Sequence, residues 1–309
     1  MSHIRLALMP RGDLRRLGAA RRAPEMTAPS RLSRLNTLMD MNTIAFIGGG
    51  NMASAIIGGL LKSGRSTDSI IVVEPFEAQR DKLRGDFKLR ALAAADASLA
   101  QAALVVWAVK PQLFMAAALP CAAHVGQALH LSVMAGIRTD AIALATGSRR
   151  VVRAMPNTPA LIGQGIAGLF ALDAVTAAEK TQVEMLLEPT GQMLWVEREE
   201  QLDAVTALSG SGPAYVFYFV EAMLQAALEM GLSAAQGRQL ALATFAGATA
   251  LAQACDDPPA LLRERVTSKG GTTHAALASL EASGVKAAFV HALKAAQQRA
   301  RELGDEFGA

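Results

Sequence analysis

Short apolar runs alternate with helix-like stretches along the first half of the chain. The first run ends in glycines, and apolar residues then recur at helical spacing through 51–61. Five runs of this kind are predicted to be strands: 43–47, 70–73, 104–109, 128–133 and 151–155. Because helix-like sequence separates successive runs, the pattern predicts an α/β fold with a doubly wound, parallel-dominated sheet.

The pattern changes near residue 200. Two further short runs, 165–171 and 193–196, are predicted to be edge strands, with a helix at 177–187 between them. Beyond them Ala and Leu recur at helical spacing, which predicts an all-α second part. Its helices are expected at 213–230, 233–254, 259–266, 272–282 and 285–303. We therefore expect an α/β domain at 41–200 and a helical domain at 201–309.

Composition and charge limit the class of protein. The chain has 309 residues, 51% of them hydrophobic, which is enough to bury a large core. Its pI of about 9.0 reflects the first forty residues, where eight arginines stand against three acids. The net charge of residues 1–40 is +5, whereas that of the whole chain is +3. Residues 41–309 therefore have a net charge of −2. A mildly acidic body has no electrostatic reason to bind nucleic acid, and no such partner is expected.

The arginine-rich residues 1–40 share the acid-poor composition of organelle transit peptides. We interpret them instead as a disordered extension or the product of a start codon placed too far upstream, with Met41 as the functional start. No uninterrupted apolar stretch is long enough to span a bilayer, so no membrane partner is expected. Cys121 and Cys255 have no His or Cys at metal-ligand spacing, so we expect no disulfide, no metal site and a cytoplasmic location.

The segment after the first predicted strand has the pattern of a dinucleotide-binding turn. Its sequence, GGGNMA at 48–53, fits G-x-G-x-x-A between a strand and a helix. The first Gly permits a tight turn, Gly50 lets the backbone approach a pyrophosphate, and Ala53 lets the helix pack closely on the sheet. The N–H groups at the helix start then face the phosphates. The cofactor-binding residues expected in this segment are Gly48, Gly50, Asn51, Met52 and Ala53.

Two charged residues near the second predicted strand bear on the choice of cofactor. Glu74 ends that strand, where an acid can accept hydrogen bonds from the adenosine ribose hydroxyls and favour NADH. An NADPH site needs a cation for the 2′-phosphate, and Arg80 lies one or two helical turns further on. Arg80 can equally be a solvated helix charge. The sequence leaves NADH and NADPH open.

Further motifs make the pattern specific. AVKP at 108–111 follows what we count as the fourth strand, RAMPNTP at 153–159 closes a later one, and VTSKGGTT at 266–273 lies between two predicted helices. Together with GGGNMA and with SGSGPAY at 209–215, they resemble the pyrroline-5-carboxylate reductase family in order and spacing. The resemblance covers about residues 42–304.

This resemblance implies a Rossmann-like N-terminal domain, a helical C-terminal dimerisation domain, and homodimers that can assemble further into a decamer. It implies reduction of L-1-pyrroline-5-carboxylate to L-proline by hydride transfer from NADPH or NADH, the last step of proline biosynthesis. The loop 108–111 is expected to line the ribose and nicotinamide. The cofactor-binding residues that the resemblance adds are Ala108, Val109, Lys110, Pro111 and Asn157.

The glycine-rich segment 268–273 has a physical logic of its own. Glycines before a helix start present several backbone N–H groups in a concave nest, which suits a small carboxylate. The substrate-binding residues expected there are Ser268, Lys269, Gly270, Gly271 and Thr272. By resemblance, Thr273 lies near the substrate ring nitrogen, where its hydroxyl can donate or relay a proton as the catalytic group. A Thr at a helix start is otherwise an ordinary N-cap.

Two positions depart from the family pattern. Lys269 stands where proline is frequent, and it can reinforce carboxylate binding or point to solvent. Asp256 stands where some relatives have a glutamate near the substrate amine, and it is a further candidate for substrate binding. An imine is far more electrophilic when protonated, so no strong acid is expected. Four histidines are interpreted as surface or packing residues: His124, His130, His274 and His291.

Alternative functions differ in what they require. A β-hydroxyacid dehydrogenase usually has a catalytic Lys on a helix after a Gly-rich segment, and 209–222 contains none. Another imine reductase would share the fold and the cofactor. A non-catalytic dinucleotide-binding oligomer would have no need of the nest at 268–273. The many small residues at 233–254 favour a subunit interface or simply a good helix.

Overall fold

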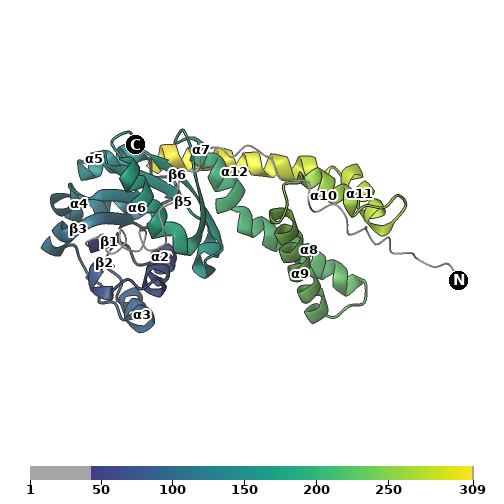
Figure 1. The fold of residues 1–309 in the computed structure, drawn as a ribbon, viewed down its shortest axis with the longest axis horizontal. Helices are drawn as coiled ribbons and strands as arrows, with labels where there is room; N and C mark the ends of the chain where they lie inside the picture. Colours follow the sequence, from purple (N-terminus) through teal and green to yellow (C-terminus); the bar gives the residue numbers. More distant parts are fainter. Residues whose placement is uncertain (1–42, 308–309) are drawn as a thin grey trace, which may run out of the picture.

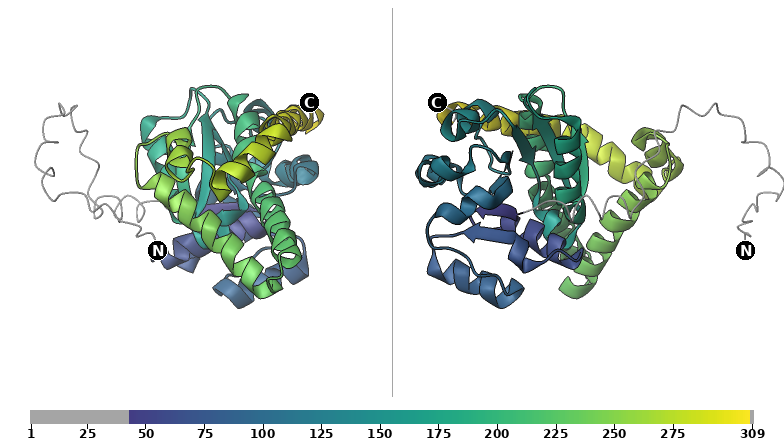
Figure 2. Two further views of the ribbon diagram at one scale, coloured as in Figure 1. Left: turned by 90° about the vertical axis from the view of Figure 1, so that its right-hand side faces the viewer. Right: turned by 60° about the vertical axis from the view of Figure 1, so that its left-hand side comes forward.

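The computed structural model describes residues 43–307, which form an α/β unit and a long helical arm (Figure 1). The arginine-rich extension and Met41 lie outside the described residues. The chain leaves the α/β unit after its last strand, runs out along the arm and comes back along one long helix, so that its C-terminal end lies beside the sheet again (Figures 1 and 2). No helix within 43–307 is long and apolar enough to cross a bilayer.

One seven-stranded sheet forms the centre of the α/β unit, in the order β2-β1-β3-β4-β5-β6-β7. All neighbouring strands are parallel except β5 and β6. The expected parallel-dominated, doubly wound sheet is therefore confirmed. The strands are β1 Thr43–Ile47, β2 Ile70–Val73, β3 Ala102–Trp107, β4 Leu129–Ser132, β5 Val151–Met155, β6 Gly165–Ala171 and β7 Gly191–Trp195.

Two features of the sheet differ from the expectation. The run before AVKP is β3, the third strand and not the fourth, because only β1 and β2 precede it within 43–307. The strand β6 lies inside the sheet and runs antiparallel to β5. A parallel return needs a crossover of a dozen or more residues, and the short 3₁₀ segment Thr158–Ile162 between β5 and β6 leaves no room for one.

Side chains alternate between the two faces of each strand, so one strand supplies two cores. Ile44 and Phe46 of β1 pack under α2 (Asn51–Lys62), α3 (Glu77–Phe87) and α6 (Ala177–Leu187). Ala45 and Ile47 pack on the opposite face under α4 (Phe114–Val125) and α5 (Thr139–Thr146). These layers hold the carboxyl ends of β1 to β5 at one edge of the sheet.

The arm contains only helices, as expected for this part of the chain. It starts from α7 (Gln201–Val205) and a π-helical turn at Thr206–Gly210, which pack on the sheet through the buried Leu202 and Ala207. The remaining helices are α8 Gly212–Glu229, α9 Ala234–Gln253, α10 Pro259–Arg265, α11 Thr272–Ala282 and α12 Val285–Phe307. The helices α8 and α9 form a hairpin, α10 and α11 lie at the far end, and α12 returns to the α/β unit (Figure 1).

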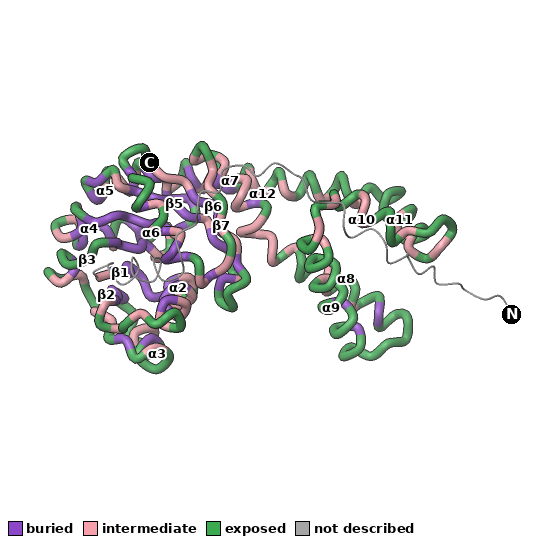
Figure 3. The backbone as a smooth tube through the Cα atoms, in the orientation of Figure 1, coloured by how far each residue is buried: buried purple, intermediate pink, exposed green. Residues whose placement is uncertain are grey.

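Most of the arm is exposed, in contrast to the α/β unit (Figure 3). Large apolar side chains remain open on both helices of the hairpin: Val216, Phe217, Tyr218, Met223, Leu228, Leu240, Leu242 and Leu251. So many exposed large apolar side chains on one hairpin favour an interaction surface there.

We predict that buried His130 makes the fold sensitive to acid. Its Nδ1 accepts a hydrogen bond from Trp107 Nε1, 3.2 Å away. Burial, and next the positive charge of Arg150, lower the pKa of His130 from 6.5 to about 4. The unfolded chain takes up a proton near pH 6.5 and the folded chain does not, so this contribution is present above pH 6.5 and is lost as the pH falls towards 4. Between pH 7.5 and 5 the free energy of unfolding should fall by about 2 kcal/mol from this group.

Chemical denaturation at both pH values measures this difference. A His130→Asn variant keeps an acceptor for Trp107 but does not titrate, so it should lose about 2 kcal/mol less than the wild type between the two pH values. Equal losses in the two proteins would show that another group is responsible.

Candidate cofactor site and substrate loop

The glycine turn joins the carboxyl ends of three neighbouring strands. Gly48 N–H donates to Val73 O and Ala108 N–H donates to Ile47 O, both at 2.8 Å. Gly48 has a φ of +96°, and a Cβ there would lie 2.7 Å from Ala108 O. Both the left-handed backbone and this close approach require glycine. The turn and the loop 108–111 therefore lie together at one edge of the sheet.

The start of α2 has the properties that a pyrophosphate requires. Its N-cap is Gly50, which offers no side-chain cap, and the first turn has no acidic residue. A Cβ on Gly50 would meet no protein atom within 4 Å, so the packing of the chain does not require glycine at this position. The backbone N–H groups of the exposed Asn51 and of Met52 are those that precede the first helical hydrogen bonds. Buried Ala53 packs on the sheet, as expected from the motif.

Glu74 has a structural bond that the sequence did not reveal. Its Oε2 accepts a hydrogen bond from Gly49 N–H and its Oε1 accepts one from Phe76 N–H, both at 2.9 Å. The side chain is buried, and both of its oxygens hold backbone at the glycine turn and at the end of β2. Glu74 thus lies at the expected ribose position, but its first role is to fix the turn.

Arg80 is bound to the backbone rather than fully solvated. Its Nη1 donates to Glu74 O at 3.0 Å and to Pro75 O at 2.6 Å. These bonds place the guanidinium at the end of β2, beside the position where an adenosine ribose lies in this fold. A half-buried cation at this point suits a 2′-phosphate.

An apolar pocket of about 340 Å³ opens next to the glycine turn. It lies between the ends of β1 and β2 and the start of α4, and it is large enough for part of a planar ring system. The residues around its mouth and walls include Ile47, Val73, Pro75, Phe76, Val109, Leu113 and Ala117. The sequence reasoning missed Phe76 and Leu113, because no periodic pattern joins segments so far apart. Cys121 at the floor of the pocket is a packing residue, and burial raises its pKa to about 11.

Asn157 and Lys110 lie on the loops that follow β5 and β3. Asn157 is buried, and its Oδ1 accepts a hydrogen bond from Ile166 N–H at 3.0 Å, which fixes the start of β6. Lys110 is exposed and precedes the 3₁₀ turn Pro111–Leu113. All the cofactor-binding residues expected from the sequence therefore lie at the carboxyl edge of β1, β2, β3 and β5.

The loop 268–273, where the sequence predicts substrate binding, has a defined turn. Gly271 N–H donates to Ser268 O at 3.0 Å, and Gly270 has a φ of +75°. Lys88 is the one non-glycine residue of 43–307 with positive φ, so Lys269 has negative φ. A turn with this combination is of type II, with Lys269 at the position that favours proline. This geometry would suit the proline that the family resemblance implies at this place, and Lys269 is exposed.

Thr272 and Thr273 form the first turn of α11, and Gly271 is its N-cap with no side-chain cap bond. Thr273 is therefore not the cap of this helix, and its partly exposed hydroxyl belongs to the first turn. Asp256 is exposed on the loop before α10, and the neighbouring Asp257 instead pairs with Arg265. The loop lies at the far end of the arm from the glycine turn of the same chain (Figure 1).

A glycine turn at the edge of a doubly wound sheet, an acid-free helix start and an adjacent apolar pocket define a dinucleotide-binding protein of the Rossmann class. Similarity to known proteins narrows this class. The family described as "Pyrroline-5-carboxylate reductase dimerisation" matches residues 199–303, and that described as "NADP oxidoreductase coenzyme F420-dependent" matches 43–136. The chain belongs to the pyrroline-5-carboxylate reductase family.

Individual relatives cover nearly the whole described chain. The pyrroline-5-carboxylate reductase of Pseudomonas aeruginosa is 43% identical over 272 residues, which span 87% of this chain and 100% of the relative. That of Haemophilus influenzae is 40% identical over 273 residues, 86% of this chain and 98% of the relative. The solved reductase of Coxiella burnetii superposes with a TM-score of 0.78 at 35% identity and covers 85% of this chain and 99% of its own. That of Plasmodium falciparum, solved with NADP bound, gives 0.76 at 26% identity, with 85% and 98% covered.

Two glycines of the turn should respond differently to alanine. Gly50→Ala adds a Cβ that meets no protein atom, so it should cost no more than about 1 kcal/mol of stability, the loss of a good N-cap residue, while weakening dinucleotide binding at least about tenfold. Gly48→Ala should instead cost about 2 kcal/mol or more through its positive φ and its contact with Ala108.

Urea denaturation and cofactor titration by fluorescence separate the two effects. Unaltered dinucleotide affinity in a folded Gly50→Ala variant would contradict the placement of the pyrophosphate at the start of α2.

Proposed function

We propose that this chain reduces L-1-pyrroline-5-carboxylate to L-proline with NADPH as its preferred hydride donor, and that each active site combines two copies of the chain. The observation that carries the proposal is the separation of two binding surfaces within one chain. The dinucleotide edge lies on the sheet, and the carboxylate-binding loop 268–273 lies at the far end of the arm (Figure 1). A second copy can bring a loop to each edge.

The cofactor surface divides into two halves around the glycine turn. The start of α2 and Gly50 hold the pyrophosphate, while Arg80 and the pocket beside Phe76 hold the phosphorylated adenosine. Loop 108–111 and Asn157 border the nicotinamide half, because they follow strands on the other side of the turn. When bound, the reduced nicotinamide supplies the hydride that the imine carbon accepts.

The substrate half is built from backbone. The type II turn at 268–271 leads directly into α11, so N–H groups at the helix start can bind the substrate carboxylate, and exposed Lys269 adds positive charge nearby. Thr273, free of a capping role, can donate its hydroxyl proton towards the ring nitrogen, and Asp256 can stabilise the positive charge of the iminium. Because a protonated imine is already electrophilic, catalysis depends mainly on positioning and exclusion of water.

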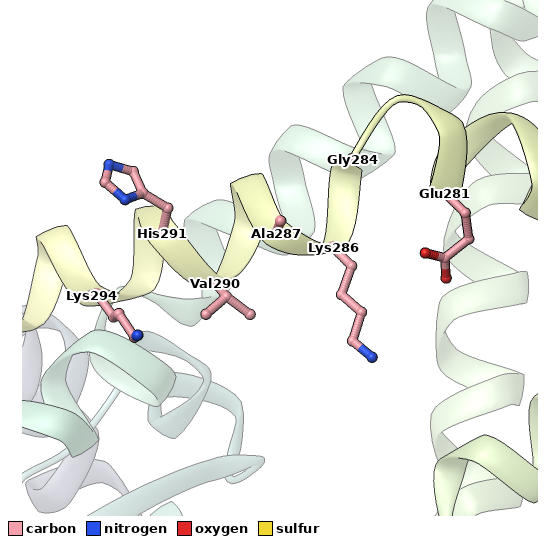
Figure 4. A pocket seen from close by; sticks show the side chains of 7 residues that line it. All are labelled: Glu281, Gly284, Lys286, Ala287, Val290, His291 and Lys294. Atoms are coloured by element: carbon pink, nitrogen blue, oxygen red, sulfur yellow. The ribbon is translucent and has the colours of Figure 1, made fainter.

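The protein is a homo-oligomer by virtue of its dimerisation domain, and the arm supports a dimer as the working unit. The open apolar faces of α8 and α9 have nothing to cover them within the described residues. The inner side of α12 is open too, with Val290, Lys286 and Lys294 on one side of the helix and His291 on the other (Figure 4). Burial of this surface against a second arm stabilises a dimer at about 25 cal/mol per Å² of apolar area.

The wider organisation follows from the same proposal. Residues 41–200 act as the cofactor unit and 201–309 as the unit for dimerisation and substrate binding. Assembly beyond the dimer, to a decamer, rests on family resemblance. The free thiols of Cys121 and Cys255 suit a reducing cytoplasm.

The first test follows NADPH and NADH oxidation with pyrroline-5-carboxylate by absorbance, in the wild type and in Arg80→Ala. Loss of a charge-assisted contact with the 2′-phosphate should raise the KM for NADPH about tenfold or more and leave that for NADH within about twofold. No oxidation of either cofactor by the folded wild type would overturn the reaction. Equal effects on both cofactors would remove the 2′-phosphate role of Arg80.

Mixing two impaired variants, assayed at a cofactor concentration too low to saturate the Gly50→Ala chain, tests whether the site is shared. A Gly50→Ala chain has a weakened cofactor edge and a Thr273→Ala chain lacks the substrate hydroxyl, so each homodimer should be impaired. In a mixed dimer one site joins the intact edge of one chain to the intact loop of the other. Random mixing should restore about a quarter of wild-type activity, since half of the dimers are mixed and each has one intact site.

The mixture is compared with each variant alone after the same unfolding and refolding. A mixture no more active than the sum of its parts would mean that the edge and the loop belong to one chain.

A further inference from the structure

Glu199 joins three separate segments of the chain through its carboxylate. Its Oε1 accepts hydrogen bonds from Thr139 N–H at 2.9 Å and from Arg153 Nη1 at 2.8 Å, and its Oε2 accepts one from the Thr139 hydroxyl at 2.5 Å. The Arg153 side chain is only 4% exposed and that of Glu199 is 16% exposed. The three bonds are thus largely shielded from water.

The three segments meet behind the nicotinamide half of the cofactor edge. Thr139 is the first residue of α5 and ends the loop 133–138, which leaves the carboxyl end of β4. Arg153 lies on β5 beside Ser132 of β4, and the loop after β5 contains Asn157. Glu199 lies just before α7, where the arm begins. One carboxylate therefore fixes the loop 133–138 to β5 and to the base of the arm.

The other side of this loop rests on the end of α12. Gly136 has a φ of +78°, and a Cβ there would lie 3.3 Å from both Leu303 O and Phe307 Cδ2. Arg138 pairs with Asp305 at 2.5 Å and lies directly over Gly304. The loop is held between the two ends of the arm, with Glu199 at one and α12 at the other. These contacts restrict the conformations that the loop 133–138 can adopt.

Stability alone is a weak reason for such a pair. A buried ion pair gains little net free energy over well-packed apolar residues of similar size, because desolvation offsets the attraction. The bonds do fix an orientation, because the Glu199 carboxylate binds both the backbone N–H and the side-chain hydroxyl of Thr139. The loop that they fix emerges between the loops after β3 and β5, where the proposed nicotinamide site lies.

We propose that Glu199 is a positioning residue for hydride transfer: through Thr139 and Arg153 it fixes the β4–α5 loop against the nicotinamide half of the site and couples that loop to the arm. The inference rests on the proposed function for its reaction. It assigns no role to Glu199 in the adenosine half of the site, which lies over β1 and β2.

The chain contains a matched control for this arrangement. Glu179 accepts hydrogen bonds from Thr176 N–H, the Thr176 hydroxyl and Arg150 Nε, at 2.7, 2.9 and 2.6 Å. This set of donors is the same as at Glu199, but Arg150 precedes β5 and so lies at the opposite edge of the sheet. The Arg150 side chain is 43% exposed, so the pair is less shielded on the arginine side, but the Glu179 side chain is buried. Glu179→Gln should disturb the same set of carboxylate bonds without touching the cofactor edge.

The experiment compares Glu199→Gln, Thr139→Val, Thr139→Ser and Glu179→Gln in the full-length protein. Each variant is assayed for kcat/KM with pyrroline-5-carboxylate, for affinity towards NADPH and towards 2′-phospho-ADP-ribose, which lacks the nicotinamide, and for dimer content by light scattering. Glu199→Gln and Thr139→Val should lower kcat/KM at least about tenfold and reduce the NADPH affinity relative to the fragment, because small displacements of positioning groups are costly. Thr139→Ser, which keeps the hydroxyl, should stay within about twofold of the wild type.

Two results would overturn the inference. The first is that Glu199→Gln and Thr139→Val retain the kcat/KM and the NADPH-to-fragment affinity ratio of Glu179→Gln. The second is that all of the loss follows a fall in dimer content, so that activity per dimer is unchanged. Absence of turnover in the wild type would remove the proposed reaction instead, and the affinity ratio would still decide the role of Glu199.

Discussion

The apolar surface of the α8–α9 hairpin is the constraint on which the rest of the structure depends. The hairpin helices pack on each other, and α8 also contacts α12 through Tyr215 and Phe219 on Phe289. Phe217, Tyr218 and Leu251 are among the large side chains left open. Exposed apolar side chains of this kind favour association with another surface, and the match to a dimerisation family supports a homo-oligomer. In the proposed dimer a second copy covers these residues. The same extension that exposes the hairpin also separates loop 268–273 from the cofactor edge of its own chain (Figure 1). Under the proposed function, the extended arm therefore explains both why two copies associate and why each active site needs both of them.

Local motifs of the sequence predicted most of this architecture because their geometry is local. The glycine turn, the following helix and the alternation of strands and helices follow from short-range patterns, and so does the all-helical arm. The reversal of β6 did not, since it depends on the absence of a crossover between β5 and β6. The numbering of the strand before AVKP was also wrong, because only β1 and β2 precede it in the described chain.

Contacts in the site that link distant segments could not be predicted from the sequence. Glu74 was assigned to a ribose from its position, yet its carboxylate holds Gly49 and Phe76 N–H groups, which no pattern of residue types reveals. The pocket residue Phe76 and the bond of Glu199 to Thr139 were missed for the same reason. Lys269 shows the opposite case, in which a departure from the family became interpretable once the turn type was known. A sequence motif locates a binding site along the chain. The three-dimensional contacts show which of its polar atoms already have a partner within the protein and which can bind a ligand.

In the proposed enzyme each active site joins the sheet edge of one chain to the arm of another. A crystal structure of the dimer with NADP⁺ and L-proline tests it most directly. We expect the proline carboxylate to be bound by N–H groups of 268–273 from one protomer, while the nicotinamide beside it lies on loop 108–111 of the partner. Proline and nicotinamide both bound by a single chain, or proline bound away from 268–273, would contradict it.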